Sequence, residues 1–269
     1  MKNFNESTAL ITGGSSGIGL AVAQKLVELG ANVWILARRK KTLQEASQNL
    51  EKLKITASQQ IITIQADVSD YSSLKSAIEK AVSKYGVPDL LINSAGIAHP
   101  GEFLSLDHQV YEDVIHINYL GTVFATKIIA PYMVERKQGH IVNISSLAGV
   151  VPIFGYSAYA PSKYAVNAFS SILKTELTPY NIHISVVYPP DTDTPQLEFE
   201  NTIKPDITKA ITESGGLLSA STVAKSIING IKKEKYTIIP GTEGKLLKAF
   251  SPIVARVLHN SAVRKAKDR

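Results

Sequence analysis

Short apolar runs alternate with longer segments of helical periodicity along most of this chain, and this rhythm limits its fold more than any other feature. The apolar runs are expected to be strands and lie at residues 9–12, 32–37, 61–65, 90–93, 140–144 and 183–188. The periodic segments are expected to be helices and lie at 18–29, from 38 to about 53, and at 71–85, 108–136 and 157–177. Strand–helix–strand crossovers place helices on both faces of a parallel sheet. The sequence therefore predicts an α/β fold with one doubly wound, mostly parallel sheet.

The sequence also indicates the expected domain limits. No linker rich in Pro, Gly or Ser divides the 269 residues, so we expect one domain over residues 1–240. Residues 192–218, rich in Thr, Pro and Glu, interrupt the rhythm just after a strand. Ligands bind at the carboxyl ends of parallel strands, so this irregular segment is predicted to be a substrate lid. Residues 241–269 are predicted to form a basic, amphipathic C-terminal tail.

Composition excludes several classes of protein. The absence of cysteine excludes a disulfide scaffold, a thiol nucleophile and a zinc site built on cysteine, and we expect no metal. The net charge of +6 comes largely from lysine and arginine clusters without interleaved aromatic residues, which favours a solvated surface over a nucleic-acid groove. The N-terminus has no apolar signal region and no apolar run reaches about 18 residues. These features predict a soluble, cytoplasmic protein.

A glycine-rich turn follows the first expected strand and opens the first helix. Glycine lets the backbone turn tightly and approach a pyrophosphate, whose charge the helix N-terminus favours. By itself, a glycine-rich turn is about as often a purely structural turn as a nucleotide-binding one. In this context it predicts a Rossmann-type dinucleotide site formed by Gly13, Ser15, Ser16, Gly17, Ile18 and Gly19.

The end of the second expected strand indicates which dinucleotide binds. Folds that bind NAD place an acidic residue there to hold the ribose 2′-hydroxyl. This chain has Ala37 followed by Arg38 and Arg39, and a guanidinium can bind a 2′-phosphate with two hydrogen bonds. As plain surface cations, they would oppose the dipole of the helix that follows. We therefore expect NADPH rather than NADH.

Tyr159 and Lys163 stand four residues apart, thirteen residues after Ser146. A tyrosine hydroxyl has a reference pKa of about 10, and an ammonium one helical turn away favours its phenolate. A serine hydroxyl can hold a carbonyl or alcohol oxygen beside it. Such a pair alone is usually a surface contact, but next to a dinucleotide site it predicts proton transfer coupled to hydride transfer. Residue type does not separate Ser145 from Ser146.

These motifs together resemble the short-chain dehydrogenase/reductase family over about residues 7–240. The resemblance implies that Tyr159 is the proton donor and that Lys163 binds the nicotinamide ribose and lowers the tyrosine pKa. It implies that Asn118 supports a proton relay, and the family's spacing favours Ser146. It also implies contacts with the cofactor or its sheet from Asp67, Val68, Asn93, Ala95 and Gly96.

The segment after the sixth strand departs from the usual family pattern. Pro190 replaces a glycine, and Pro189, Thr192 and Thr194 remain as candidate contacts for the nicotinamide. The segment most resembles the 3-ketodihydrosphingosine (3-ketosphinganine) reductases of this family. That resemblance implies NADPH-dependent reduction of 3-ketosphinganine to sphinganine, a lipid-like ketone, in sphingolipid synthesis.

Several alternatives stay open. The substrate is otherwise expected to be a 3-oxoacyl thioester, a steroid or a small ketone, and a regulator that binds NADP without turnover is the alternative outside enzymes. Residues 150–156 form either a pocket wall or core. The tail lies either on an anionic membrane or on protein. A homodimer or homotetramer is expected by analogy. The acidic lid residues are either solvated or paired with a substrate amine, and they are Asp191, Asp193, Glu198 and Glu200.

Overall fold

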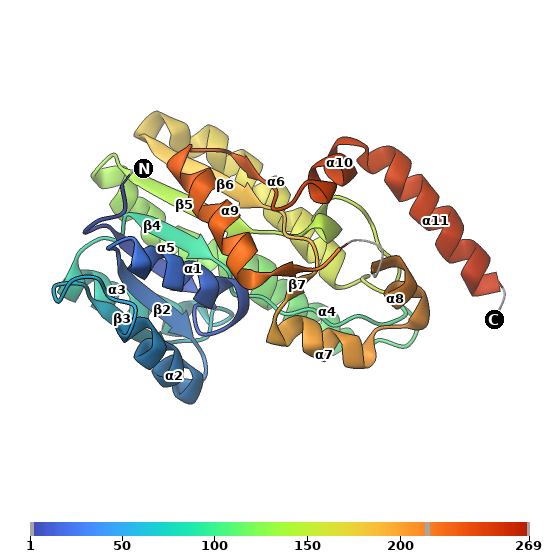
Figure 1. The fold of residues 1–269 in the computed structure, drawn as a ribbon, viewed down its shortest axis with the longest axis horizontal. Coiled ribbons are helices and arrows are strands. Elements are labelled where there is room, and N and C mark those ends of the chain that lie inside the picture. Colours follow the sequence, from blue (N-terminus) through green and yellow to red (C-terminus); the bar gives the residue numbers. More distant parts are fainter. Residues whose placement is uncertain (1–2, 213–215, 268–269) are drawn as a thin grey trace.

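A twisted parallel sheet forms the centre of the computed structural model, which describes residues 3–212 and 216–267 (Figure 1). Its seven strands within these residues follow the order β3-β2-β1-β4-β5-β6-β9, and every neighbouring pair is parallel. The strands are β1 (Thr8–Thr12), β2 (Asn32–Ala37), β3 (Ile61–Gln65), β4 (Leu90–Asn93), β5 (Gly139–Ile144), β6 (Ile182–Val187) and β9 (Thr237–Ile238). The predicted doubly wound α/β fold is confirmed.

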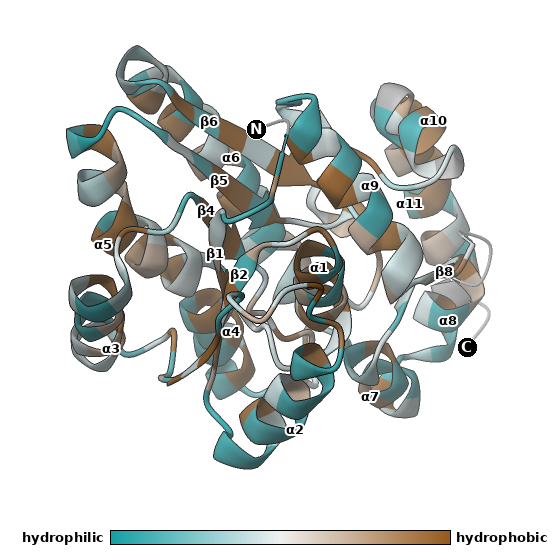
Figure 2. Ribbon diagram, turned by 60° about the vertical axis from the view of Figure 1, so that its left-hand side comes forward, coloured by the Kyte–Doolittle hydropathy of each residue, from teal (hydrophilic) through white to brown (hydrophobic). Residues whose placement is uncertain are grey.

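Helices cover both faces of the sheet. On one face they are α1 (Gly17–Glu28), α2 (Lys40–Glu51) and α9 (Ala220–Lys232). On the other face they are α3 (Tyr71–Tyr85), α5 (Gly121–Glu135) and α6 (Tyr159–Leu177). Figure 2 shows the strands as mainly apolar and α2 as largely polar toward solvent. The sheet is thus buried between two helical layers.

Side chains that alternate along the strands belong to two separate core clusters, one on each face of the sheet. In β1, Ile11 packs with α1 on one face, while Leu10 packs on the opposite face. In β2, Ile35 and Trp34 divide in the same way, and all four are 0 or 1% exposed. Successive strand residues point to opposite faces, so a strand covered on both sides is apolar throughout. This explains the continuous apolar runs of the sequence.

The helix predicted over residues 108–136 is interrupted. It consists of α4 (His108–Ile115), a π-helical turn (His116–Leu120) and α5. At the end of the wide turn, the backbone N–H of Gly121 donates to the carbonyl oxygen of His116. The turn carries Asn118, whose side chain pairs with both backbone groups of Ile97, with donor–acceptor distances of 2.8 and 2.9 Å. Periodicity alone does not reveal such a one-residue change in helical pitch.

The segment predicted to be irregular is mainly helical, which corrects that expectation. It contains β7 (Thr192–Asp193), α7 (Pro195–Ile203), α8 (Asp206–Thr212) and β8 (Leu218–Ser219), and β7 pairs with β8. Thr194 caps α7 by accepting from the N–H of Leu197, and Pro195 occupies the first helical turn. These are ordinary signals for a helix start. Residues 213–215 of the predicted lid lie outside the described residues.

The C-terminal tail forms two helices, α10 (Glu243–Ala249) and α11 (Ser251–Lys267). Figure 1 shows α11 beside α8 at one end of the molecule. The apolar side of α11 that faces inward includes Leu258 and Ala262, which pack near Ile207 and Ile211 of α8. The tail therefore packs on its own chain, as one of the two alternatives proposed. Of the helices in the described residues, none combines the length and apolarity that a membrane crossing needs.

Two short 3-10 helices complete the described secondary structure next to the strands that carry the site. They are η2 (Leu147–Gly149) after β5 and η3 (Thr178–Tyr180) after α6. The first of them follows directly on the serine pair, because Ser146 is its N-cap and accepts from the N–H of Ala148 at 3.1 Å. This hydrogen bond fixes the chain just after the end of β5.

Candidate active site

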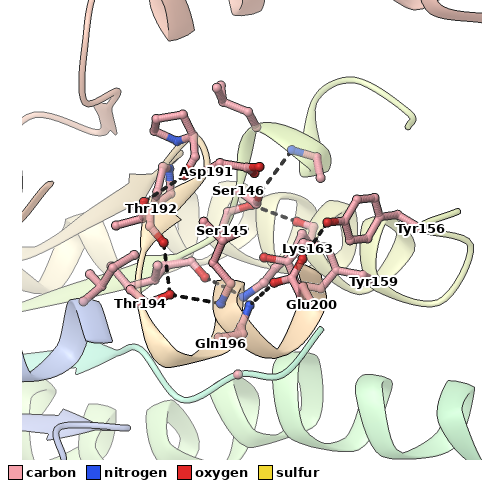
Figure 3. A pocket seen from close by; sticks show the side chains of 18 of the residues that line it. Ser145, Ser146, Tyr156, Tyr159, Lys163, Asp191, Thr192, Thr194, Gln196 and Glu200 are labelled. Carbon is pink, nitrogen blue, oxygen red and sulfur yellow. Dashed lines mark hydrogen bonds between the residues drawn. The ribbon is translucent and has the colours of Figure 1, made fainter. Parts of the chain in front are cut away.

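One cavity of about 380 Å³ extends along the carboxyl ends of the central strands. Its lining includes residues of the glycine turn and of the tail. Between them lie the serine, tyrosine and lysine predicted to react (Figure 3). Its far wall is apolar and is formed by Ile153, Ile211, Leu247, Val254 and Leu258. A cavity with one polar and one apolar end can hold a cofactor at the polar end and an apolar substrate at the other.

The glycine turn is shaped for close approach by a ligand. Gly13 and Gly17 have φ angles of +67° and +54°, which side chains other than glycine rarely adopt. A Cβ on Gly19 would collide with the carbonyl oxygen of Gly13. Ser16, the N-cap of α1, makes no side-chain capping hydrogen bond, so the first N–H groups of the helix remain available to a phosphate.

The predicted loop residues fit a dinucleotide pyrophosphate. Gly13, Ser16, Gly17 and Ile18 line the cavity, whereas Ser15 does not. Gly17 also lies close to the N-cap of α7, because a Cβ there would be 3.3 Å from Cγ2 of Thr194. This end of the cavity is therefore bordered by the glycine loop on one side and by the residue before α7 on the other.

Arg38 and Arg39 follow β2 as expected and are exposed. A guanidinium nitrogen of Arg38 lies 3.5 Å from a carboxylate oxygen of Asp67, which follows β3. Burial opposes the charge of Asp67, but hydrogen bonds from Ser69 and the Arg38 cation outweigh it and hold the pKa of Asp67 below its usual value. Next to Asp67, the side chain of Val68 is buried against Gly121. A cation therefore stands at the strand end where a 2′-phosphate is expected.

Asn93 ties the ends of the central strands together. Its Nδ2 donates to Oδ1 of Asn143 in β5 at 2.8 Å and to Oγ1 of Thr126 in α5 at 3.1 Å. Beyond β4, Ala95 and Gly96 line the cavity. A Cβ on Gly96 would be 3.2 Å from Oδ1 of Asn118, so a larger residue would press on that side chain.

Ser146 and Tyr159 face each other across the cavity and hydrogen-bond through their side chains. Ser146 follows β5, and Tyr159 begins α6. The neighbouring Ser145 is 2% exposed, and its hydroxyl donates to the backbone oxygen of Lys163 at 3.1 Å. That hydroxyl is therefore engaged with α6, which favours Ser146 as the group that meets a substrate.

Lys163 is buried one helical turn beyond Tyr159 and lines the same cavity. Its ammonium donates to the backbone oxygen of Ile144 at 3.0 Å and lies 5.6 Å from the centre of the Tyr159 ring. Burial lowers the pKa of Lys163 to about 8. This ammonium is therefore fixed in direction by β5 while it faces the cavity.

The tyrosine pKa differs from the expectation that lysine would lower it. Burial first, and then the carboxylate of Glu200, raise the pKa of Tyr159 above its usual value, although the hydrogen bond with Ser146 acts in the opposite direction. In this structure Tyr159 is thus protonated at neutral pH. A protonated hydroxyl is the form that a proton donor requires.

Asn118 is fully buried on the π-helical turn. Besides its two bonds to Ile97, its Nδ2 donates to Oγ of Ser162 at 2.9 Å. Ser162 in turn donates to the backbone oxygen of Tyr159 at 2.7 Å. Asn118 therefore connects the turn after β4 with the start of α6.

The segment after β6 closes the cavity over the reacting residues. Pro189 accepts from the N–H of Leu147 at 3.0 Å, Thr192 donates to Pro190, and Thr194 donates to Thr192. All three predicted contacts, Pro189, Thr192 and Thr194, line the cavity. These hydrogen bonds and Pro190, which stands where the family pattern has a glycine, restrict the backbone of this segment.

A buried polar group on α7 was only partly foreseen from the sequence. Glu200 is 6% exposed and accepts from the hydroxyl of Tyr156 at 2.5 Å and from Nε2 of Gln196 at 3.0 Å. Asp191 also lines the cavity, whereas Asp193 and Glu198 are exposed and outside it. The last two are solvated lid residues in this structure. Gln196 was missed because it belongs to no motif, and Tyr156 was included only as part of the possible pocket wall over residues 150–156.

Residues 150–156 supply both core and cavity wall. Val151 is 1% exposed, whereas Ile153 and Tyr156 line the cavity. The ring centres of Tyr156 and Tyr159 are 5.5 Å apart. The two alternatives for this segment thus each describe part of it.

Comparisons with known proteins agree with this geometry. The family model described as short chain dehydrogenase matches residues 7–204. A 3-dehydrosphinganine reductase of Danio rerio is 38% identical over 249 residues, which are 92% of this chain and 75% of the relative. A 3-ketodihydrosphingosine reductase of Dictyostelium discoideum is 38% identical over 257 residues, 90% of this chain and 77% of the relative. A solved short-chain dehydrogenase from Sphingobium yanoikuyae in complex with NADPH has a TM-score of 0.77 and 26% identity, covering 97% of this chain and 94% of that one.

Proposed function

Because the chain belongs to the short-chain dehydrogenase/reductase family, we propose that it is an NADPH-dependent reductase that converts 3-ketosphinganine to sphinganine. One observation carries the proposal. The hydroxyls of Ser146 and Tyr159 meet in a cavity that joins a glycine turn to an apolar wall formed partly by the tail. The names of the Danio rerio and Dictyostelium discoideum relatives support the substrate.

The chain's own residues perform the proton chemistry. Ser146 donates a hydrogen bond to the ketone oxygen and orients it toward Tyr159. The protonated Tyr159 donates its proton to that oxygen as negative charge develops there. Lys163, oriented by its bond to Ile144, binds ribose hydroxyls and stabilises the phenolate that remains. Asn118 positions the surrounding backbone through Ile97.

NADPH fits the polar end of the cavity. When bound, its nicotinamide supplies the hydride that reduces the ketone carbon. Gly13, Gly17 and the free N–H groups of α1 hold the pyrophosphate, and Arg38 binds the 2′-phosphate. The NADPH complex of the Sphingobium yanoikuyae relative supports this choice of cofactor.

A substrate panel tests the proposal. Purified protein with NADPH is offered 3-ketosphinganine or acetoacetyl thioester, and NADPH consumption is followed by absorbance. We expect the amino ketone to have the higher kcat/KM. Higher efficiency with the thioester would reject the sphingoid substrate and retain the reductase, whereas no turnover of any ketone would favour an NADP-binding regulator.

The outward face of the tail suggests the surface on which the protein meets a lipid-like substrate. Leu246, Phe250, Ile253 and Val257 are 54 to 63% exposed at helical spacing, and exposed Arg256 lies among them. We propose that this face lies on an anionic lipid surface, since apolar and basic side chains together favour that position.

Sedimentation with anionic vesicles is the test of the membrane contact. We expect the protein to pellet with anionic vesicles and to pellet less when Phe250 and Ile253 are replaced by serine. Absence of pelleting would reject the membrane contact. A change in oligomeric state caused by the same substitutions would assign the face to a second copy of the chain instead.

A further inference from the structure

We propose that Glu200 binds the ammonium group of the substrate and thereby makes the enzyme selective for α-amino ketones. This inference rests on the proposed reduction of an amino ketone and identifies the residue that recognises it. Nothing in the pattern of motifs distinguishes Glu200 from the other acidic residues of the lid, so the assignment comes from its contacts.

Glu200 is a buried carboxylate in the wall of the substrate cavity. It is 6% exposed and projects from α7 toward the reacting residues (Figure 3). Oε2 accepts from Tyr156 and Oε1 accepts from Gln196. A carboxylate has about four acceptor positions, so these two bonds orient the group and leave further acceptor capacity for a ligand cation.

The carboxylate lies next to the hydroxyl that donates the proton. Gln196 hydrogen-bonds both Glu200 and Tyr159, so a single side chain separates the two groups. The charge of Glu200 is the second strongest influence on the pKa of Tyr159, after burial. In an α-amino ketone the nitrogen and the carbonyl oxygen stand on adjacent carbons. A ketone held at Tyr159 therefore brings its ammonium within reach of Glu200.

Charge balance in the lid favours a cationic ligand. The ammonium of Lys204, whose side chain is 1% exposed, lies 3.5 Å from Asp191 and 3.9 Å from Glu200. When all three groups are ionised, one cation faces two carboxylates and the cluster has one negative charge in excess. The side chain of Asp191 is 35% exposed and can be solvated, whereas the charge of Glu200 is buried and is costly unless it is paired. A substrate ammonium supplies the missing positive charge.

A comparison of two ketones tests the assignment in the full-length protein with NADPH. The first ketone is 3-ketosphinganine, and the second is the same molecule with hydrogen in place of the amine. For Glu200→Gln we expect kcat/KM to fall about 10- to 100-fold with the amino ketone, mainly through KM, as for loss of a hydrogen bond to a charged group. With the ketone that lacks the amine, we expect KM to change by less than about 3-fold, because any effect of Glu200 on the proton donor Tyr159 alters kcat for both ketones.

A matched control and a distinct failure pattern make the test specific. Glu198→Gln changes an exposed carboxylate of the same helix and is expected to leave both efficiencies unchanged. Equal losses with both ketones in Glu200→Gln would overturn the ammonium assignment alone. If the unaltered protein reduces the ketone without the amine but not 3-ketosphinganine, the proposed function fails and the assignment fails with it.

The unaltered protein provides a second measurement that does not depend on a variant's folding. Burial raises the pKa of Glu200 even though hydrogen bonds from Tyr156 and Gln196 lower it. As pH falls, Glu200 loses its charge, so KM for the amino ketone is expected to rise while KM for the ketone without the amine stays constant. Parallel changes of the two KM values would overturn the assignment.

Discussion

Arg38 provides the sharpest test of the cofactor preference, because its removal affects binding and stability by very different amounts. Its side chain is 57% exposed and pairs with Asp67, whose side chain is 34% exposed, at 3.5 Å. An ion pair this exposed contributes only about 0–1 kcal/mol to folding. By contrast, a hydrogen bond to a charged phosphate is worth about 1.5–3 kcal/mol. Arg38→Ala should therefore change cofactor selection far more than stability.

The expected magnitude follows from that difference. A loss of about 1.5–3 kcal/mol corresponds to about a 10- to 150-fold fall in kcat/KM for NADPH. The freed carboxylate of Asp67 adds repulsion toward the 2′-phosphate in the same direction. NADH has no 2′-phosphate, so its kcat/KM should change little. The preference between the two cofactors is then expected to shrink by most of the NADPH loss.

The assay is steady-state reduction of one ketone with NADPH and with NADH, at fixed ionic strength because the contact is exposed. Lys41→Ala is the control, since it removes an exposed cation from the first turn of α2, just after Arg38. A preference for NADPH that survives Arg38→Ala unchanged would refute the role of Arg38. An equal loss in Lys41→Ala would show that only general charge attraction operates.

Other variants test the remaining site and the fold. Tyr159→Phe should reduce kcat at least about 100-fold while fluorescence titration still detects NADPH binding, because only the proton donor is lost. Reduction should decline as pH rises through about 8, where burial places the pKa of Lys163, and a kcat/KM profile of Lys163→Arg should lack that decline. Gly19→Ala should weaken NADPH binding in the same titration, because its Cβ meets the loop carbonyl. Burial lowers the pKa of His140 to about 3, so only the unfolded state gains its proton below about pH 6.5. Its contribution to the free energy of unfolding should drop by about 2 kcal/mol between pH 7 and 5, and denaturant titrations of His140→Leu should lack that drop.

The sheet was predictable because its signal is local and continuous. Residues 33–37 and 90–92 are continuous apolar runs, and the structure places both in strands inside the sheet. The short strand β9 was not predicted, because two residues are too few to show a periodic pattern of hydrophobicity. The helices within residues 192–218 were not predicted, because the polar composition of this segment was given more weight than the Thr194 cap and Pro195.

The site was predictable only where a residue belongs to a spaced motif. Spacing indicated Ser146, Tyr159 and Lys163, and the fold brings all three to one cavity. Gln196 and Tyr156 act through side-chain contacts between α7 and the start of α6, and no spacing in the sequence encodes such a contact. The raised pKa of Tyr159 has the same origin, since it depends on burial and on Glu200.

The π-helical turn at His116–Leu120 has a consequence for how this chain is aligned with others. A π turn holds one residue more than the α-helical turn it replaces, and each residue rotates a helix by about 100°. Deleting one residue there would turn α5 by that angle and move Ile129 and Met133 out of the core. A relative that lacks the extra residue therefore needs its gap inside the turn, next to Asn118, so that both flanking helices keep their register.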